Sequence, residues 1–222
     1  MGNSRRNLRP YIRKTMLTLA VLASLLLAVG NAYAWFIKTD SVKNVLKSPD
    51  LQFSFKVDEQ FVSPESTKPG QTVKKVVDVK NTGDEPGFVR VLVLAEIVSV
   101  DGEVLEAIPG TTFTFDGLNV TDWTSGNTKM WANGGDGYYY YLGKLVPGTG
   151  TLQPLFKSVT LSADLPPKYQ GASMKIEVKV EATETTRAKY RDGWWGRGDN
   201  PPEGSALIRI DDILEDLAKT TP

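Results

Sequence analysis

The sequence predicts an all-β fold, in which two antiparallel sheets pack face to face and one short helix follows near the C-terminus. Two observations lead to this prediction. Apolar and polar residues alternate in two segments, 51–57 and 174–182, as they do in half-buried strands, and β-branched runs occur between them. Turn-forming Gly, Pro, Asn and Asp residues separate these segments, and no helical period occurs before the end of the chain. Some segments are apolar on both faces, which favours a β-sandwich over a βαβ fold.

The first 34 residues have the three parts of a signal peptide, and we expect them to be removed. The apolar stretch, residues 16–29, is shorter than the roughly 20 residues that a permanent membrane helix needs. The motif Ala32-Tyr33-Ala34 then predicts cleavage before Trp35. An uncleaved anchor is the alternative. The basic start consists of Arg5, Arg6, Arg9, Arg13 and Lys14.

Composition restricts the chemistry of the exported chain. Removal of five bases and no acid turns the balance of 26 bases and 26 acids into 21 against 26, a net charge of about −5. This sign disfavours a nucleic-acid partner. The chain has no Cys and no His, which excludes disulfides, thiol catalysis, zinc sites built from Cys or His, and imidazole-dependent triads. We therefore expect a protein that is not an enzyme.

Seven strands are predicted along the remaining chain. The clearest alternation occurs in residues 51–57 and 174–182, where every second residue is apolar. The other predicted strands are 73–79, 88–98, 111–115, 138–145 and 155–161. Asn81-Thr82-Gly83-Asp84 separates two of them, and its Asn and Gly tolerate positive φ angles. This turn predicts either a hairpin or a corner between two sheets.

Two segments depart from the strand pattern. Residues 119–137 and 183–204 are rich in Gly, Asn, Asp and Thr, yet both contain tryptophan, so we expect long surface loops held by aromatic anchors. After the second segment, Ser205 is a candidate N-cap for an amphipathic helix. The apolar face of that helix would consist of Leu207, Ile210, Leu214 and Leu217.

Aromatic residues offer one candidate ligand site. Stacked side chains on a β-sandwich could bind sugar rings, and the residues available for this are Trp123, Trp131, Tyr139, Trp194 and Trp195. In the competing interpretation, Tyr138–Tyr141 form a buried strand and the tryptophans cover the open ends of the core.

The carboxylates give no clear acid/base pair and only a weak indication of calcium. Asp211-Asp212 and Glu215-Asp216 are expected on the solvated face of the terminal helix. Four aspartates fall near glycines without the spacing of a calcium-binding loop, namely Asp101, Asp116, Asp122 and Asp136. No cofactor is expected.

Several motifs, in this order, resemble the TasA/camelysin family of secreted biofilm-matrix fibre proteins, which have their own SipW-type signal peptide. The matching motifs are Lys68-Pro69-Gly70, Asn81-Thr82-Gly83, Phe88-Val89-Arg90, Tyr169-Gln170-Gly171-Ala172-Ser173-Met174-Lys175-Ile176 and Glu181-Ala182-Thr183. The resemblance extends from the signal to about residue 183. It implies a jelly-roll-like β-sandwich and processing by a dedicated signal peptidase. Although camelysin-like members have been described as metallopeptidases, this chain lacks H-E-x-x-H, and no peptidase activity is predicted.

Fibre formers of the family donate the freed N-terminal segment to the next subunit as an extra strand. The matching segment here is 35–47, and its apolar residues are Trp35, Phe36, Ile37, Val42, Val45 and Leu46. An extended segment that completes a sheet edge gains main-chain hydrogen bonds while alternate side chains fill pockets. The alternative is a disordered leader, or one that docks on its own domain.

Together these observations predict a chain of four parts: signal peptide 1–34, donor strand 35–47, β-sandwich 48–184 and C-terminal tail 185–222. We expect an extracellular structural subunit that polymerises with itself in a matrix or at the cell surface. Its other expected partners are the signal peptidase and an accessory matrix protein, with membrane contact only through the uncleaved signal. The alternative function is a monomeric adhesin or carbohydrate-binding module that uses the aromatic loops.

Overall fold

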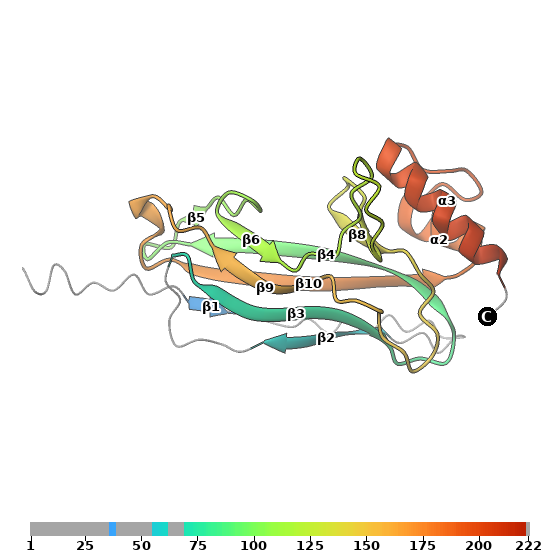
Figure 1. The fold of residues 1–222 in the computed structure, drawn as a ribbon, viewed down its shortest axis with the longest axis horizontal. Helices are drawn as coiled ribbons and strands as arrows, with labels where there is room; N and C mark the ends of the chain where they lie inside the picture. The colour runs from blue at the N-terminus through green and yellow to red at the C-terminus, as the bar shows by residue number, and fades with distance from the viewer. Residues whose placement is uncertain (1–35, 39–54, 62–68, 221–222) are drawn as a thin grey trace, which may run out of the picture.

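The computed structural model describes residues 36–38, 55–61 and 69–220, which form two packed β-sheets and two α-helices (Figure 1). The predicted all-β sandwich with a C-terminal helix is confirmed. The strands are β1 (Phe36–Lys38), β2 (Phe55–Phe61), β3 (Thr72–Asn81), β4 (Gly87–Val98), β5 (Val104–Leu105), β6 (Phe113–Asp116), β7 (Trp131–Asn133), β8 (Tyr138–Tyr141), β9 (Phe156–Leu161) and β10 (Ser173–Glu184). The helices are the 3-10 turn η1 (Pro167–Tyr169), α2 (Arg187–Trp195) and α3 (Ser205–Lys219).

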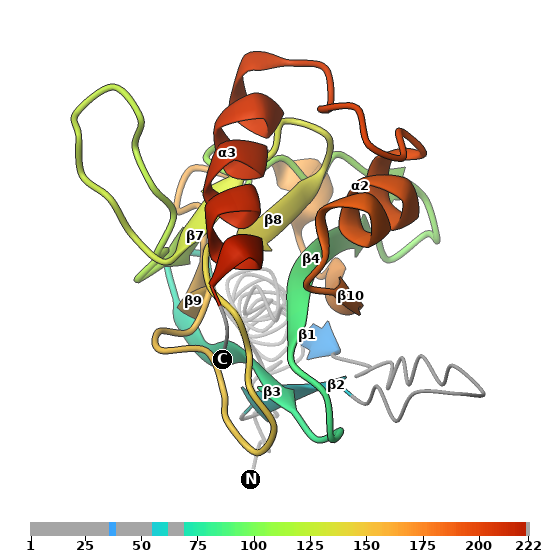
Figure 2. The same cartoon turned by 90° about the vertical axis from the view of Figure 1, so that its right-hand side faces the viewer.

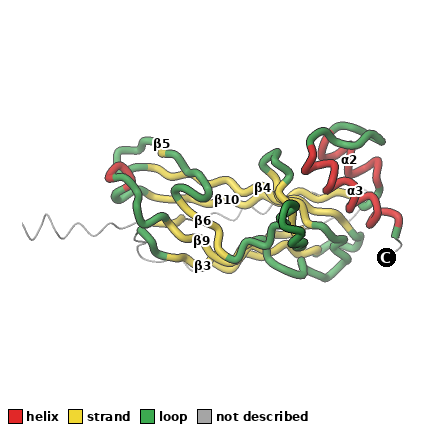
Figure 3. Tube along the Cα trace, turned by 45° about the horizontal axis from the view of Figure 1, so that its top comes forward, coloured by secondary structure: helices red, strands yellow, loops and turns green. Residues whose placement is uncertain are grey.

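One sheet has six strands and the other has four. The six-stranded sheet has the order β1-β10-β4-β8-β7, with β5 paired to the far end of β4, and the four-stranded sheet has the order β2-β3-β9-β6. All pairs are antiparallel except β1 with β10, which is parallel. The long strands run along the length of the molecule, α2 and α3 lie at one end, and the short η1 lies at the other (Figure 3).

The main core lies between the two sheets and is mostly aliphatic. On β10 the buried positions alternate with half-exposed ones, as the sequence predicted for residues 174–182. The strand residues buried in this core are Phe55, Val73, Val77, Val79, Val89, Val91, Ile97, Phe113, Trp131, Tyr141, Phe156, Val159, Leu161, Met174, Ile176, Val178 and Val180.

A corner joins the two sheets between β3 and β4. Asn81 is fully buried there, and its Nδ2 donates hydrogen bonds of 2.8 Å to the carbonyls of Glu85 and Leu145, while its Oδ1 accepts one of 2.9 Å from the Gly83 amide. Because β3 and β4 belong to different sheets, the turn is a sandwich corner and not a hairpin.

A second hydrophobic cluster lies on the opposite face of the six-stranded sheet, beneath α2 and α3 (Figure 1 and Figure 2). We call these two helices, with the strand residues that they cover, the helical layer. Its buried members are Phe88, Ala132, Tyr140, Leu142, Tyr190, Trp194, Ile210 and Leu214. Phe88 and Val89 illustrate how neighbours on one strand serve the two clusters, because successive side chains point to opposite faces.

Several predicted boundaries were wrong. The segment 183–204, expected to be a loop, contains α2, and the loop 119–137 contains β7. β8 ends at Tyr141 and not at residue 145. The N-cap of α3 is Gly204, with φ of 99°, so Ser205 is the first helical residue and not the cap. Residues 51–54 of the first predicted strand lie outside the described residues.

Candidate functional site

The outer edge of β10 is the place where the N-terminal leader meets the domain. β1 lies in parallel beside the beginning of β10, with the Cα pairs Phe36 and Ser173, Ile37 and Met174, and Lys38 and Lys175. Two of the predicted donor-strand residues, Phe36 and Ile37, therefore belong to a strand at a sheet edge. The other leader and cleavage residues lie outside the described ranges: Ala32, Ala34, Trp35, Val42, Val45 and Leu46.

β10 is much longer than β1, the strand that pairs with its outer edge. On its inner side it pairs with β4 over all of its 12 residues. On its outer side, β1 pairs with the first three of them, and within the described ranges no other strand pairs there. The edge of a sheet exposes a row of backbone N–H and C=O groups that can accept a further strand.

The outward face of β10 carries alternating charges. Lys175, Glu177 and Lys179 follow one another at every second position, and the Glu177 carboxylate lies 4.0 Å from Lys175 Nζ and 3.4 Å from Lys179 Nζ. Charged side chains on an edge strand discourage unspecific sheet-to-sheet association.

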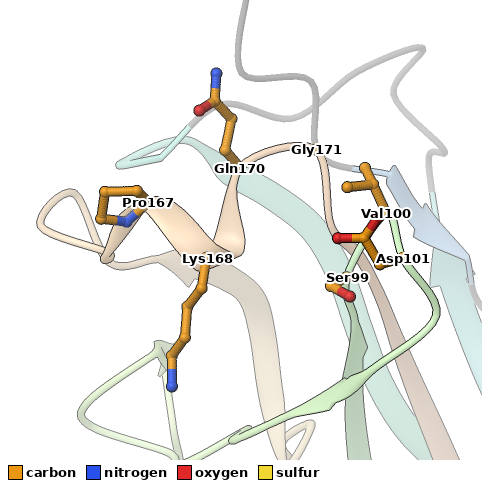
Figure 4. Close-up of a pocket in the computed structure, with 7 residues that line it drawn as sticks. All are labelled: Ser99, Val100, Asp101, Pro167, Lys168, Gln170 and Gly171. Carbon is orange, nitrogen blue, oxygen red and sulfur yellow. The ribbon is translucent and has the colours of Figure 1, made fainter.

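A pocket of about 490 Å³ lies at the end of the sheet where β1 and β10 begin (Figure 4). The turn after β4 and the segment from η1 to β10 form its walls. The lining residues are Ser99, Val100, Asp101, Pro167, Lys168, Gln170 and Gly171. Ser99 Oγ accepts a 3.0 Å hydrogen bond from the Glu103 amide, which fixes one side of the turn.

The structure distributes the aromatic candidate residues over two layers. Trp131 is fully buried in the sandwich core, where its Nε1 donates a 2.9 Å hydrogen bond to the Gln153 carbonyl. Tyr139 packs against the same core. Trp194 and Trp195 belong to the helical layer, and Trp123, in the loop before β7, packs against the same cluster. The five residues therefore do not form one platform.

A buried ion pair joins the two helices. The Asp211 carboxylate accepts hydrogen bonds from Arg191 Nε at 2.8 Å, from Arg191 Nη2 at 2.6 Å and from the Tyr190 hydroxyl at 2.9 Å. Both charged side chains are almost inaccessible, with exposed fractions of 5% for Arg191 and 2% for Asp211. The expectation that Asp211 is solvated was wrong, because the partner cation comes from a helix that the sequence did not predict.

Glu215 extends this network to the surface. Its carboxylate lies 2.8 Å from Arg191 and 3.3 Å from Arg187. Partial desolvation alone would raise the pKa of Glu215, but the hydrogen bond from Arg187 and the charges of Lys219 and Arg191 lower it below the usual value. The α2–α3 contact is thus held by paired charges as well as by apolar packing.

Arg90 connects the helical layer to the sheet. Its Nε donates a 2.8 Å hydrogen bond to Glu181, and its Nη1 donates to the Tyr140 hydroxyl and to the Trp194 carbonyl, both at 3.2 Å. The guanidinium carbon lies 3.9 Å from the centre of the Tyr138 ring. One side chain therefore ties together β4, β8, β10 and α2.

The candidate calcium residues lie apart, each with its own contacts. Asp116 accepts hydrogen bonds from Ser158 and Thr160 on β9, Asp122 from Thr124 in its own loop, and Asp136 from the Tyr140 hydroxyl at 2.6 Å. Asp101 lines the pocket at the end of the sheet. In the part of the chain that the structure describes, no group of three or more Asp, Glu, His or Cys residues is placed to hold a metal ion.

A search of the described helices found none that is both long enough and apolar enough to span a membrane. No protein-family model, no curated protein and no solved structure matches this chain. Its function is therefore inferred from the geometry above and from the sequence.

Proposed function

We propose that this chain is an exported structural subunit that polymerises into extracellular fibres by donating its N-terminal leader to the outer edge of β10 on a neighbouring copy. The observation that carries the proposal is the parallel pairing of Phe36–Lys38 with Ser173–Lys175. The resemblance to the TasA/camelysin fibre proteins supports the same assignment.

A sheet edge that pairs with a strand of its own chain can pair with the same strand of an identical chain. The contacts are the same in both cases, so exchange between copies alters little except the connectivity. The predicted leader, residues 35–47, is about as long as the 12-residue edge that β10 offers. Each additional backbone hydrogen bond along this edge contributes roughly 0.5–1.5 kcal/mol to docking.

The signal peptide provides timing in this proposal. Before cleavage, residues 1–34 hold the leader at the membrane, and after cleavage before Trp35 the leader is free to reach another copy. The proposed partners are therefore the signal peptidase during export, further copies of this chain, and an accessory matrix protein. No catalytic activity and no cofactor belong to this proposal.

Electron microscopy tests the dependence of assembly on the leader. Protein beginning at Trp35 is compared with protein beginning at Ser48, which retains the sandwich and lacks the leader. Fibres are expected only from the longer form. If both forms remain monomeric, or if both form the same fibres, strand donation is wrong.

Cysteine cross-linking tests the register and the direction of donation, and the absence of native cysteine makes the products unambiguous. Neighbouring strands lie roughly 4.8 Å apart, within the roughly 4.4–6.8 Å Cα separation that a disulfide spans. Affinity-tagged chains with Lys38→Cys are mixed with untagged chains with Lys175→Cys. A disulfide-linked heterodimer is expected under fibre-forming conditions.

The matched control replaces Lys175→Cys with Lys179→Cys. Lys179 is a charged residue on the same face of β10, about 13 Å further along the strand, so a specific register gives no cross-link there. A double variant that closes an internal disulfide, combined with no heterodimer in the mixture, would show that the leader stays on its own domain and would overturn the proposal.

A further inference from the structure

The pocket at the end of the six-stranded sheet lies where the leader enters. Gly171, one of its lining residues, is two positions before Ser173, and Ser173 pairs with Phe36. In a parallel pair, one step back on β1 corresponds to one step back on β10, about 3.3 Å. If β1 continued back by one residue in the same register, that residue would pair with Ala172, the neighbour of the pocket residue Gly171.

Cleavage before Trp35 would make that one residue the first of the mature chain. Its backbone nitrogen, an uncharged amide in the precursor, then becomes a positively charged α-ammonium with three hydrogen-bond donors. Cleavage changes the charge of no side chain in the leader. The α-ammonium is therefore the group that distinguishes the cleaved chain from the precursor.

The pocket contains acceptors that suit such a cation. Asp101 supplies a carboxylate and Ser99 a hydroxyl oxygen, whereas Figure 4 shows the Gln170 side chain extending away from both of them. Figure 4 shows the Lys168 side chain extending away from Asp101, and Lys168 Nζ lies 5.3 Å from the centre of the Tyr169 ring. The same view shows the Asp101 carboxylate beside the backbone near Gly171.

Gly171 lies close to Val100 at this end of the pocket. It adopts φ of 71°, and a Cβ atom at this position would meet Val100 Cγ1 at 2.9 Å. The positive φ favours glycine at this position, and the backbone before β10 lies close to the exposed side chain of Val100.

We propose that this pocket binds the α-ammonium of the mature leader, with Asp101 as the charged acceptor, and so distinguishes cleaved chains from precursors. The inference rests on the proposed function, because it takes the leader to be the segment that docks. The pocket serves in the same way whether the leader comes from its own domain or from a neighbouring copy, since the register with β10 is the same.

Chemical labelling of the α-amine tests the pocket on unassembled protein. Monomeric protein beginning at Trp35 is treated with an N-hydroxysuccinimide ester at pH 7, and the labelled N-terminal peptide is quantified by mass spectrometry. An ordinary α-amine has a pKa of about 7.7–8.0, and a partly exposed carboxylate partner raises it. Loss of that partner in Asp101→Asn is expected to speed labelling about threefold.

Two controls separate the pocket from the general charge of this end of the molecule. Glu103→Gln removes an exposed carboxylate two residues away and is expected to leave the labelling rate unchanged. A chain beginning at Ala34, with its α-ammonium displaced by one residue, is expected to label equally fast with Asp101 and with Asn at that position. The inference would be overturned if the chain beginning at Trp35 and its Asp101→Asn variant were labelled at the same rate. It would also be overturned if Glu103→Gln accelerated labelling as much as Asp101→Asn does.

The outcome is distinguishable from that of the proposed function. Fibres that form from protein with an unprotected α-amine would overturn the pocket and leave strand donation intact. A protected α-amine in protein that never forms fibres would overturn strand donation and leave the pocket intact.

Discussion

The sandwich core and the helical layer each bury a cationic side chain, and they hold it in opposite ways. Lys75 lies on β3 among the core residues Val73 and Val77, and burial lowers its pKa from 10.5 to about 7. In the helical layer, the hydrogen bonds from Arg191 to Asp211 outweigh desolvation and raise the pKa of Arg191. The sandwich therefore favours the neutral form of its cation, whereas the helical layer keeps its cation charged.

The difference indicates two ways of stabilising a layer. Packing of alternating apolar side chains holds the sandwich, and such packing tolerates change wherever volume is kept. The helical layer depends on a polar network in which each charged group is paired with another. The loss of one member therefore leaves a buried charge without its partner, and its desolvation cost is no longer offset. Substitutions in the two layers should therefore differ in size, in extent and in pH dependence.

The largest effect is expected from Phe156→Ala in the sandwich core. Phe156 is fully buried and stacks on Phe115 with ring centres 4.4 Å apart. The cavity should cost about 3–5 kcal/mol of unfolding free energy, measured by chemical denaturation. Because the core spans both sheets, all spectroscopic probes should shift together.

The neighbouring residue provides the control for that prediction. Lys157 is exposed on the same strand, and Lys157→Ala should change the free energy of unfolding by no more than about 0.5 kcal/mol. A cost below about 1 kcal/mol for Phe156→Ala would contradict the view that close packing holds the sandwich together.

The sandwich was also the part that could be predicted from the sequence. Alternation on residues 174–182 reflects a core on one face of the strand, a local property that any window of the sequence reveals. The helix α3 was predicted for the same reason, because Ile210 and Leu214 repeat at a helical period. Such patterns fix which residues are buried without reference to the rest of the chain.

The next largest effect is expected from Asp211→Ala in the helical layer. The change removes the acceptor of three hydrogen bonds and leaves the Arg191 guanidinium buried, with Glu215 as its remaining charged partner. The cost should be about 3 kcal/mol, at the lower end of the range for breaking a buried pair, because Glu215 still compensates part of the charge. Hydrogen exchange should report the loss at α2 and α3 and leave β10 protected.

Two further variants sharpen this prediction. Asp212→Ala removes an exposed carboxylate at the adjacent position and should leave hydrogen exchange in α3 unchanged. The double variant Arg191→Met with Asp211→Leu should recover most of the lost stability, since apolar residues of similar volume often replace a buried ion pair at little cost. Destabilisation as large in the double variant as in Asp211→Ala would mean that the charges themselves are required.

The third prediction concerns the dependence of stability on pH, which should differ between Lys75 and Arg191. Since the folded pKa of Lys75 is lower than its unfolded value, the unfolded chain binds more protons between about pH 7 and pH 10. Stability should therefore rise with pH across that window, by at most about 1.4 kcal/mol per pH unit. Lys75→Met should remove this rise and should stabilise the protein at pH 7.

Denaturation at pH 7 and pH 9 measures this difference. The background is low, because the chain has no His or Cys, and burial raises the pKa values of Tyr139, Tyr140, Tyr141 and Tyr190. Arg191→Met is the matched comparison and should not alter the slope, since arginine stays charged throughout the window. If the rise of stability with pH were the same in Lys75→Met as in the unmodified protein, Lys75 would not be its cause.

The candidate site was predictable only in part. The leader was predicted from the motif Ala32-Tyr33-Ala34, but the order of strands in a sheet depends on long-range pairing, so the sequence does not reveal that β10 lies beside β1. α2 was missed because its buried face combines Tyr190, Arg191 and Trp194, and the charge of Arg191 becomes compatible with burial only through Asp211, 20 residues later. The separation of Trp131 from Trp194 has the same origin, since tertiary contacts decide which layer receives each aromatic ring.

The smallest effect is expected from Trp195→Phe at the junction of the helical layer and the sheet. Trp195 Nε1 donates a 3.0 Å hydrogen bond to the Tyr140 hydroxyl, which in turn donates to Asp136 at 2.6 Å. Phenylalanine keeps an aromatic ring near Tyr140 and removes the donor, so the cost should be about 1 kcal/mol. The loss should appear in hydrogen exchange of α2 before that of α3, because Arg191 and Asp211 still join the helices. Simultaneous loss of protection in α2, α3 and β4 would instead mean that the two layers unfold as one unit.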